Sequence, residues 1–256
     1  MELIIILFIC MVGLLFYMWK EANKDKVSEV DLMFEDFPKS FGQITVFFIS
    51  DIHRRQITDS IVNQMKGKAD LVIIGGDLTE KGVPFERVSK NLQSLKRIGP
   101  TYFVWGNNDY EVDYHQLDAI LLEHGVKILD NTAVILETEN EDKIILLGVD
   151  DMNGKRDRLD LALSDGGEQG FKILVSHNPN IIKKINKENR IRLVLSGHTH
   201  GGQIRLFNFG FYEKGKIFQT EKATLLISNG YGTTNLPLRL GAPAETHVIR
   251  ISAKKS

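Results

Sequence analysis

A layered α/β sandwich preceded by one transmembrane helix is the fold that the sequence predicts. The chain opens on an uncharged apolar run and then alternates short β-branched or aromatic runs with helical patterns. Strand patterns become more frequent in its second half, which indicates stacked layers of sheet and helix. The 256 residues suffice for one large domain, or two small ones, with a proper hydrophobic core.

The apolar run extends from Leu3 to Trp19 without a charge and ends in aromatic residues. This length lies at the short end of the roughly 17–25 residues that span a bilayer, and aromatic residues favour the membrane interface. We therefore expect residues 1–20 to form a retained membrane anchor. A cleaved signal peptide and a buried core helix are the alternatives, although Met1-Glu2 supplies no basic start for a signal peptide.

The charges that flank this run predict its orientation. Lys20, Lys24 and Lys26 follow it, whereas no Lys or Arg precedes it. The positive-inside rule then places the main domain in the cytoplasm, with the extracytoplasmic side as the alternative. We expect a single-pass protein of the cell membrane.

Residues 21–43 are expected to form a juxtamembrane segment with an edge strand, because apolar side chains alternate at Val30, Leu32 and Phe34. A hairpin is expected at Asn140-Glu141 between two alternating runs. Short apolar runs bounded by turn residues predict strands at Ile44–Ser50, Leu71–Ile74, Tyr102–Trp105, Val134–Glu137, Lys143–Gly148, Lys172–Ser176, Leu193–Ser196, Thr224–Ser228 and Val248–Ser252. Helical patterns fit Ser60–Lys66, Phe85–Lys96, Tyr114–Glu123 and Asn180–Ile185.

Charge and cysteine content exclude several classes of function. The 32 Lys and Arg against 33 Asp and Glu give a net charge of −1, which argues against nucleic-acid binding by bulk charge. A single Cys excludes a disulfide framework and CxxC-type zinc sites. Any bound metal must therefore be held by His, Asp, Glu or Asn.

Polar residues that suit metals follow five of the predicted strands. Taken singly, Asp51 or His53 is explained as well by a turn, and Asp77 or His177 by a turn or helix cap. The five tips are Asp51-Ile52-His53, Gly75-Gly76-Asp77, Gly106-Asn107-Asn108-Asp109, His177-Asn178-Pro179 and Gly197-His198-Thr199-His200-Gly201-Gly202. Ligands bind beyond the carboxyl ends of strands in α/β sheets, so together the tips predict a metal site.

The ordered series Asp-x-His, Gly-Asp, Gly-Asn-x-Asp, a strand-end His and Gly-His-x-His resembles the calcineurin-like metallophosphoesterases. The resemblance covers nearly all of residues 44–252. The tail, with Asn229-Gly-Tyr-Gly232, Leu236-Pro-Leu-Arg239 and Pro243-Ala-Glu245, is similar to the YkuE-like, membrane-associated bacterial branch. The resemblance implies a four-layer αββα sandwich over residues 44–256, with two metals at the strand tips.

The resemblance also implies a role for each tip residue. A first metal would be bound by Asp51, His53 and His200, and a second by Asn107, His177 and His198, while Asp77 bridges both. Two divalent cations, Mn²⁺ or alternatively Fe, Zn²⁺ or Mg²⁺, would share a bridging hydroxide that attacks phosphorus. Asp77 and Asn108 are accordingly expected to be catalytic, and Asn108 is expected to contact the substrate as well.

One position departs from the family pattern. Asn108 stands where the family usually has a His that contacts the phosphoryl group and protonates the leaving oxygen. Asn donates a hydrogen bond but no proton, so the leaving group is good, another residue such as His115 substitutes, or activity is low. Arg54 is a further candidate contact for the substrate phosphate, with a solvated Arg pair as the alternative. Asp109 is expected to hold the turn.

We therefore expect a membrane-anchored dinuclear phosphoesterase that hydrolyses a phosphomonoester, phosphodiester or pyrophosphate bond. Its substrate would be a phosphorylated small molecule or a lipid-linked, membrane-proximal phosphate, and no nucleic acid is indicated. The alternatives are a tethered nucleotide phosphodiesterase and a catalytically weak membrane-anchored scaffold of the same fold.

Overall fold

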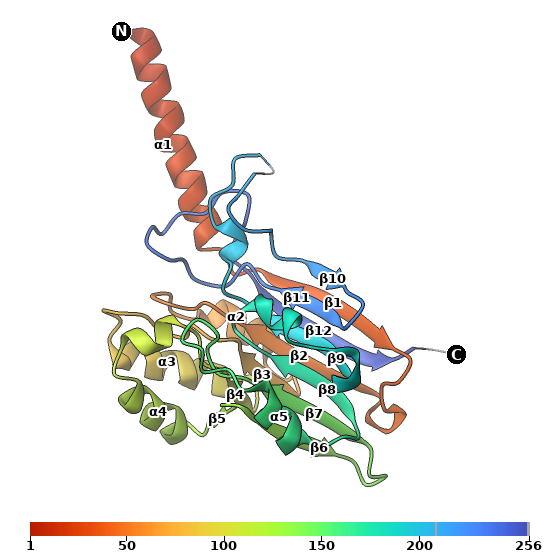
Figure 1. The fold of residues 1–256 in the computed structure, drawn as a ribbon. Helices are drawn as coiled ribbons and strands as arrows, with labels where there is room; N and C mark the ends of the chain where they lie inside the picture. Colours follow the sequence, from red (N-terminus) through yellow and green to blue (C-terminus); the bar gives the residue numbers. More distant parts are fainter. Residues whose placement is uncertain (208, 255–256) are drawn as a thin grey trace.

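Two sheets packed face to face make up the body of the protein, and helices cover both outer faces (Figure 1). The computed structural model describes residues 1–207 and 209–254. The first sheet has the order β1-β12-β2-β3-β4-β5 and the second β10-β11-β9-β8-β7-β6. The strands are β1 (Val27–Phe34), β2 (Gln43–Ile49), β3 (Leu71–Ile74), β4 (Thr101–Phe103), β5 (Lys127–Ile128), β6 (Thr132–Glu137), β7 (Lys143–Gly148), β8 (Phe171–Val175), β9 (Ile191–Ser196), β10 (Ile217–Gln219), β11 (Thr224–Ile227) and β12 (Thr246–Ala253).

Five α-helices and five 3₁₀ turns lie in the described part of the chain. The α-helices are α1 (Glu2–Ala22), α2 (Asp59–Met65), α3 (Phe85–Lys96), α4 (Tyr114–Glu123) and α5 (Leu159–Gly166). The 3₁₀ turns are η1 (Lys39–Phe41), η2 (Asn108–Glu111), η3 (Pro179–Lys183), η4 (Lys187–Asn189) and η5 (His200–Gly202).

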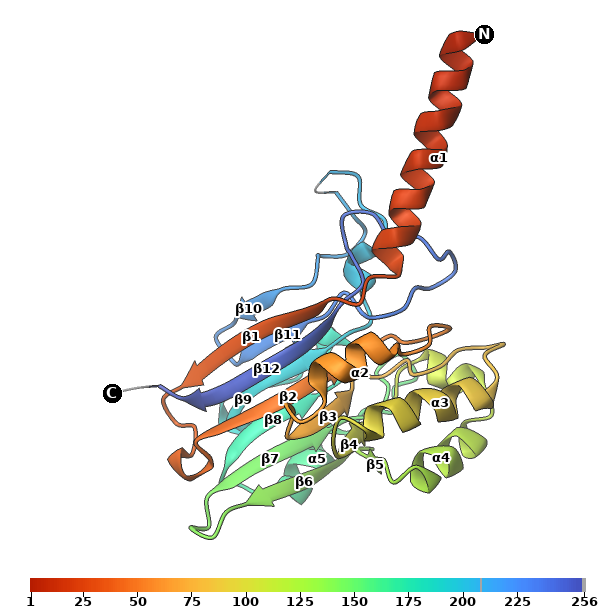
Figure 2. The same cartoon turned by 180° about the vertical axis from the view of Figure 1, so that it is seen from behind.

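Three apolar layers separate the four structural layers. Ile61 and Leu117 belong to the layer between the first sheet and α2, α3 and α4. Phe48 and Leu195 lie between the two sheets, and Ala162 of α5 packs on the outside of the second sheet. Most strands are covered on both faces and read as continuous apolar runs, as buried parallel strands do. The predicted αββα sandwich is confirmed, and Figure 2 shows the face that α2, α3 and α4 cover.

The elements agree with the sequence prediction except in short or weakly patterned segments. Every predicted strand is present with ends shifted by no more than two residues, and β1 is an edge strand that pairs in parallel with β12. The hairpin at Asn140-Glu141 joins β6 to β7. The helix expected at Asn180–Ile185 is wrong, because only the 3₁₀ turn η3 forms after Asn178 caps it. The short strands β5 and β10 and helix α5 were not predicted.

Parallel strands bring the predicted site residues to one edge. β2, β3 and β4 run parallel in the first sheet, and β8 and β9 run parallel in the second. Their carboxyl ends lead into the five tips that carry Asp, His and Asn residues. The fold thus gathers segments that are distant in sequence.

Helix α1 leaves the sandwich as a single projecting helix (Figures 1 and 2). Among the described residues, contacts with the sandwich hold its last turn: the carbonyl of Met18 accepts the N–H of Arg239 at 3.0 Å, and the carbonyl of Glu21 accepts the N–H of Ala244 at 3.1 Å. Met18, Glu21 and Ala22 are buried there, whereas the apolar residues before them are exposed. The helix is long and apolar enough to cross a membrane, and a signal sequence would pass the same test.

Candidate metal centre

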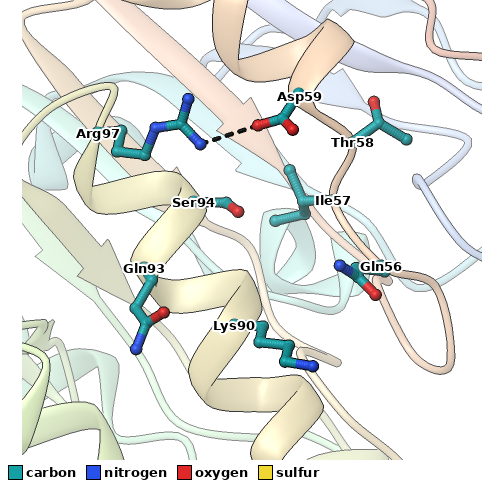
Figure 3. Close-up of a pocket in the computed structure, with 8 residues that line it drawn as sticks. All are labelled: Gln56, Ile57, Thr58, Asp59, Lys90, Gln93, Ser94 and Arg97. Atoms are coloured by element: carbon teal, nitrogen blue, oxygen red, sulfur yellow. Dashed lines mark hydrogen bonds and ion pairs between the residues drawn. The ribbon is translucent and has the colours of Figure 1, made fainter.

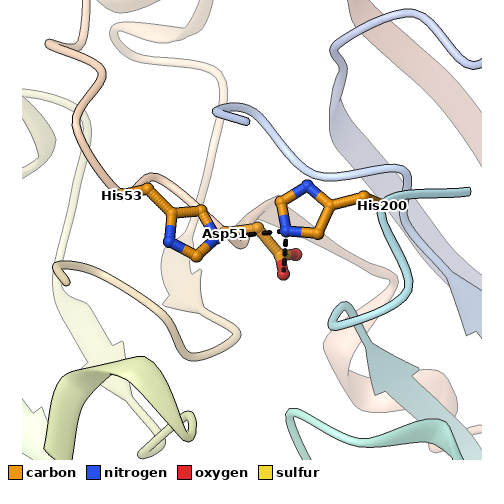
Figure 4. Close-up of side chains that lie close together, drawn as sticks. All are labelled: Asp51, His53 and His200. Atoms are coloured by element: carbon orange, nitrogen blue, oxygen red, sulfur yellow. Dashed lines mark hydrogen bonds and ion pairs between the residues drawn. The ribbon is translucent and has the colours of Figure 1, made fainter. Parts of the chain in front are cut away.

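Asp51, His53 and His200 form a first group of converging side chains (Figure 4). All three are buried, and each offers a ligand atom within 4.8 Å of the others. The Nε2 atoms of His53 and His200 lie 3.1 Å apart, and Nε2 of His200 lies 3.4 Å from Oδ1 of Asp51. Two imidazole nitrogens and a carboxylate oxygen that face one point are the donors that a divalent cation needs.

Asp77, His177 and His198 form a second group with the same span of 4.8 Å. Nε2 of His177 lies 3.1 Å from Oδ2 of Asp77 and 3.2 Å from Nδ1 of His198. Asp77 and His177 are buried, and His198 is half-buried. This donor set also fits a divalent cation of borderline character.

The carboxylate of Asp77 lies between the two groups. Its Oδ2, which contacts His177, is also 3.8 Å from Nε2 of His53 in the first group. Its Oδ1 accepts the backbone N–H of Asn108 at 2.8 Å. Asp77 is therefore placed where a carboxylate can serve two cations at once.

Five of these residues adopt the left-handed backbone region that side chains other than glycine rarely enter. The residues are Asp51 (φ 53°), His53 (51°), Asp77 (51°), His198 (70°) and His200 (49°). Such strain persists only where surrounding structure holds it, and it clusters at functional sites. Here the N–H of Asp51 donates to Gly76 at 3.0 Å, and the N–H of His198 donates to Oδ1 of Asp51 at 3.0 Å.

Two glycines beside the site leave room for its carboxylates. A Cβ on Gly106 would lie 2.2 Å from Oδ1 of Asp77, and a Cβ on Gly197 would lie 2.3 Å from Oδ2 of Asp51. Both distances are far below van der Waals contact, so the Gly-Asn and Gly-His motifs need glycine for steric reasons.

Asp109 holds the turn, as the sequence predicted. Its buried carboxylate accepts the backbone N–H groups of Asp77, Thr79 and Gly106 at 2.8, 3.0 and 2.9 Å. Burial, and then the charge of Asp77, raise the pKa of Asp109 to about 7. The residue fixes the backbone that presents Asp77 and Asn107.

Three groups that sequence reasoning missed contact the imidazoles from behind. Oε2 of Glu80 lies 3.0 Å from Nδ1 of His53, and the carbonyl of Gly75 lies 2.8 Å from Nδ1 of His177. The wholly buried Arg239 places Nη2 3.2 Å from Nδ1 of His200. Glu80 and the Gly75 carbonyl can accept an Nδ1–H, and such partners orient metal-binding imidazoles and tune their basicity. Arg239 is a donor instead, so Nδ1 of His200 accepts its hydrogen bond. The only sequence signal for Glu80 was its position three residues after Asp77.

Nearby charges move the histidine pKa values in opposite directions. Burial opposes protonation of His177, but the carboxylates of Asp77 and Asp51 outweigh it and raise the pKa of His177 to about 10. The pKa of His53 is raised as well. Burial opposes its protonation, but the hydrogen bond to Glu80 and the charges of the nearby Asp residues outweigh burial.

His198 and His200 behave in the opposite way. Burial, and then the proximity of His177, lower the pKa of His198. Burial, and then the charges of His53 and Arg239, hold the pKa of His200 well below its usual value. Because a ligand imidazole must be deprotonated, a cation would have to displace protons chiefly from His53 and His177.

A cavity of about 410 Å³ opens onto both groups. Its walls combine metal-group residues with polar and aromatic side chains of the loops that follow β4, β9 and β11. The lining residues are Asp77, Asn107, Asn108, His198, Thr199, His200, Gly202, Gln203, Phe211, Tyr212, Thr234, Asn235 and Leu236. A substrate in this cavity would reach the two groups from the side of Asp77 and His198.

Comparison with known proteins decides the family. The sequence profile of the calcineurin-like phosphoesterases matches residues 44–202. The chain belongs to the calcineurin-like phosphoesterase family. A relative in Bacillus subtilis, YpbG, is 49% identical over 210 residues, which are 81% of each chain.

Two further comparisons extend this picture. A zebrafish relative described as a transmembrane protein with a metallophosphoesterase domain is 30% identical over 88% of this chain and 56% of its own. A solved 5′-nucleotidase precursor from Thermus thermophilus has a TM-score of 0.51 at 11% identity, over 82% of this chain and 54% of its own, and supports the fold. This metallophosphoesterase thus has two His/Asp groups suited to metals, at the tips that the sequence predicted.

The remaining predicted residues of this metallophosphoesterase are placed as follows. Asn107 lines the cavity, with Oδ1 3.3 Å from Nδ2 of Asn153 and Nδ2 donating to Asn108 at 2.9 Å. Asn108 lines it too, and its Nδ2 donates to Oε1 of Glu111 at 3.0 Å. Arg54 is not among the lining residues: its Nε pairs with Glu80, and Nη2 donates to the carbonyl of Lys81.

His115, the candidate substitute acid, is exposed on α4 beside Tyr114, with ring centroids 4.2 Å apart, and does not line the cavity.

A separate cavity of about 370 Å³ lies between α2 and α3 (Figure 3). Its single carboxylate, Asp59, pairs with Arg97 at 2.8 Å, and its other lining residues include Lys90 but no His. It therefore offers no second His/Asp donor set for a phosphoesterase centre.

Proposed function

We propose that the two groups bind two divalent cations that hydrolyse a phosphate ester or pyrophosphate bond. Asp51, His53 and His200 would hold one cation, with Asn107, His177 and His198 on the other. The observation that carries this assignment is Asp77, whose Oδ2 lies 3.1 Å from His177 and 3.8 Å from His53. A shared carboxylate offsets the repulsion between two cations that are about 3.5–4 Å apart.

The bound cations, Mn²⁺ in our proposal, would lower the pKa of a water and polarise the phosphoryl oxygens. The chain itself holds Asp77 in place through the N–H of Asn108 and supports His53 and His177 through Glu80 and Gly75. Arg54, when released from Glu80, is the proposed outer contact for the phosphate.

Asn108 sets the proposed leaving-group preference. Its carboxamide lies in the cavity wall and donates a hydrogen bond to a phosphoryl oxygen in our proposal, but it has no proton to give. His115 does not line the cavity. The centre is therefore suited to substrates whose leaving group departs as a stable anion, such as a pyrophosphate or an aryl ester.

We further propose that residues 1–20 anchor the enzyme as a single membrane span, with 21–43 as the juxtamembrane segment and 44–256 as the catalytic domain. The exposed apolar surface of α1 supports this proposal. So does the zebrafish relative described as a transmembrane protein. The Lys residues after α1 favour a cytoplasmic catalytic domain, and the tail motifs support placement in the YkuE-like branch.

The test combines metal content with substrate preference in the purified full chain in detergent. We expect about two divalent ions per chain after Mn²⁺ loading, and Mn²⁺-dependent turnover of aryl diesters, aryl monoesters or pyrophosphate-linked lipids. Less than one titratable ion per chain, together with no turnover, would favour the scaffold alternative instead. Turnover limited to nucleotide diesters would favour a tethered nucleotide phosphodiesterase.

A further inference from the structure

The loop between η5 and β10 exposes an unusual set of apolar side chains. Leu206, Phe207, Phe209 and Phe211 are 68, 95, 83 and 98% exposed, and we call these four residues the aromatic tip. Single exposed apolar residues are ordinary on a protein surface, but a contiguous group marks an interaction site. The tip is therefore expected to be covered by a partner.

A short backbone turn presents the tip. The N–H of Leu206 donates to the carbonyl of Phe209 at 3.1 Å, and the N–H of Phe209 donates back to Leu206 at 3.0 Å. Phe207 lies within this turn, and its 95% exposure shows that nothing in the described chain covers it.

The loop that carries the tip projects from the same end of the sandwich as α1 (Figures 1 and 2). One short segment connects the two elements: the N–H of Arg205 donates to Leu240 at 2.8 Å, and the N–H of Arg239 donates to Met18 of α1 at 3.0 Å. The direction of α1 and the base of the tip are thus fixed by neighbouring residues.

The side chains at the end of α1 suggest what covers the tip. Tyr17 and Trp19 are about half exposed, at 49 and 50%, where the apolar helix meets the sandwich. Aromatic residues at the end of an apolar span are typical of the boundary between membrane and water. A tip that projects from the same place along α1 would meet that boundary layer.

The same loop continues into the cavity of the metal centre. Phe211, the last residue of the tip, lines that cavity with Tyr212, as do Asp77 and His198. An opening whose rim carries an exposed aromatic side chain at the end of the sandwich that bears α1 would face the bilayer surface.

From these observations we propose that the aromatic tip enters the interfacial layer of the bilayer as a second membrane contact, and that the metal centre receives the pyrophosphate head group of a membrane lipid. The substrate part rests on the proposed function above, whereas the membrane contact does not. A lipid whose head group lies at the interface would reach the cavity without leaving the membrane.

The first test reports on the membrane contact without using activity. Cys10 is replaced by Ser, and a single Cys at Phe207 or at the exposed Leu122 of α4 is labelled with an environment-sensitive fluorophore. The full chain is reconstituted into vesicles of phosphatidylethanolamine and phosphatidylglycerol. We expect blue-shifted emission at position 207 and iodide quenching lower by about tenfold than at position 122. Equal quenching at the two positions would overturn the contact, whether or not the enzyme is active.

The second test asks whether the substrate comes from the membrane. The variant Phe207→Ser/Phe209→Ser changes tip residues that do not line the cavity, and Leu122→Ser/Leu161→Ser is the control with exposed apolar residues elsewhere. We expect the tip variant to lose about tenfold or more of its turnover of a vesicle-embedded polyprenyl pyrophosphate, but to keep its turnover of soluble geranyl pyrophosphate.

The control variant should retain both activities. An equal loss on both substrates, or no loss on either, would contradict the lipid assignment. Hydrolysis of an aryl diester without hydrolysis of either pyrophosphate would also overturn it, while leaving the phosphoesterase assignment intact.

Discussion

The two His/Asp groups use similar donors but are supported in different ways. In the first group, side chains stand behind the imidazoles: Glu80 behind His53 and Arg239 behind His200. In the second group, a backbone carbonyl, that of Gly75, stands behind His177. The first group is also buried throughout, whereas the second ends in the half-buried His198 at the cavity wall.

This difference indicates that the surroundings of the two groups affect their imidazoles in different ways. Support from charged side chains can tune the basicity of an imidazole, whereas a carbonyl mainly fixes its orientation. The first group is therefore open to tuning by mutation behind the ligands. The second group contributes Asp77 and His198 to the cavity wall beside Asn108, whereas the first group contributes His200.

The largest effect is expected from removing the carboxylate that the two groups share. Asp77→Asn should lower Mn²⁺-dependent turnover by about a thousandfold or more and weaken both metal sites, because the carboxylate charge between them is lost. Metal titration by calorimetry and turnover of an aryl diester measure the two effects. Unchanged turnover would rule out the two-metal mechanism.

A mutation of the residue that contacts one imidazole should affect the metal affinity of one group and not that of the other. Glu80→Gln leaves the ligands in place but removes the charge next to His53, so one of the two Mn²⁺ sites should weaken by about 10–100-fold. Calorimetric titration should then resolve one weakened and one unchanged site.

The matched control is Asp59→Asn, which removes the exposed carboxylate that pairs with Arg97. It should alter neither Mn²⁺ site. Equal weakening of both sites by Glu80→Gln would mean that the two groups are not supported separately.

Placing a proton donor at position 108, beside the second group, should change the selectivity for leaving groups and not the affinity for metal. Asn108→His should raise the turnover of alkyl phosphates, whose leaving groups need protonation, by about tenfold to a hundredfold. Aryl and pyrophosphate substrates should change little. A uniform change across leaving groups, measured as kcat/KM for a series of esters, would show that no acid is missing.

The smallest expected effect concerns a histidine outside both groups. His247 is buried on β12 with Nε2 3.0 Å from Oγ of Ser228. Burial lowers the pKa of His247 to about 4, against the partial opposition of Glu245. As pH falls below about 6.5, the unfolded chain binds this proton before the folded one, so stability is lost between about pH 6.5 and pH 4.

The loss attributable to His247 is at most about 3 kcal/mol. Urea unfolding of the metal-free protein at pH 7 and pH 4.5 should show a smaller loss of stability for His247→Asn than for wild type. His115→Asn, which changes an exposed imidazole, should keep the wild-type pH dependence. Identical losses in all three proteins would exclude His247 as a source of acid sensitivity.

The sequence predicted the convergence of the site but not its support. Asp51, Asp77 and His177 each follow a buried apolar run, and parallel strands bring such ends together, so their meeting followed from local pattern and order. Glu80 and Arg239 were missed because their contacts depend on loop packing. Arg239 lies 39 residues beyond His200, and no periodic pattern signals a wholly buried arginine in a loop.

The sequence also did not predict the unusual backbone conformations of the site or the shortest secondary-structure elements. Nothing in local propensity indicates that Asp51 or His200 adopts a positive φ, because long-range hydrogen bonds impose it. The fold class followed from strong strand patterns, whereas β5 and β10, with two and three residues, are too short to carry a pattern. Helix α5 was missed although Leu159 and Ala162 are spaced for one buried helical face.

Arg239 gives the anchor a mechanical consequence for the chemistry. Its backbone N–H is tied to Met18 in the last turn of α1, while its guanidinium stands behind His200 and binds the carbonyls of Asn229 and Gly232. A sideways pull on the helix would therefore reach an imidazole of the centre through a single residue. Shortening the chain past Met18 to obtain a soluble enzyme would remove a brace from the first metal group along with the anchor.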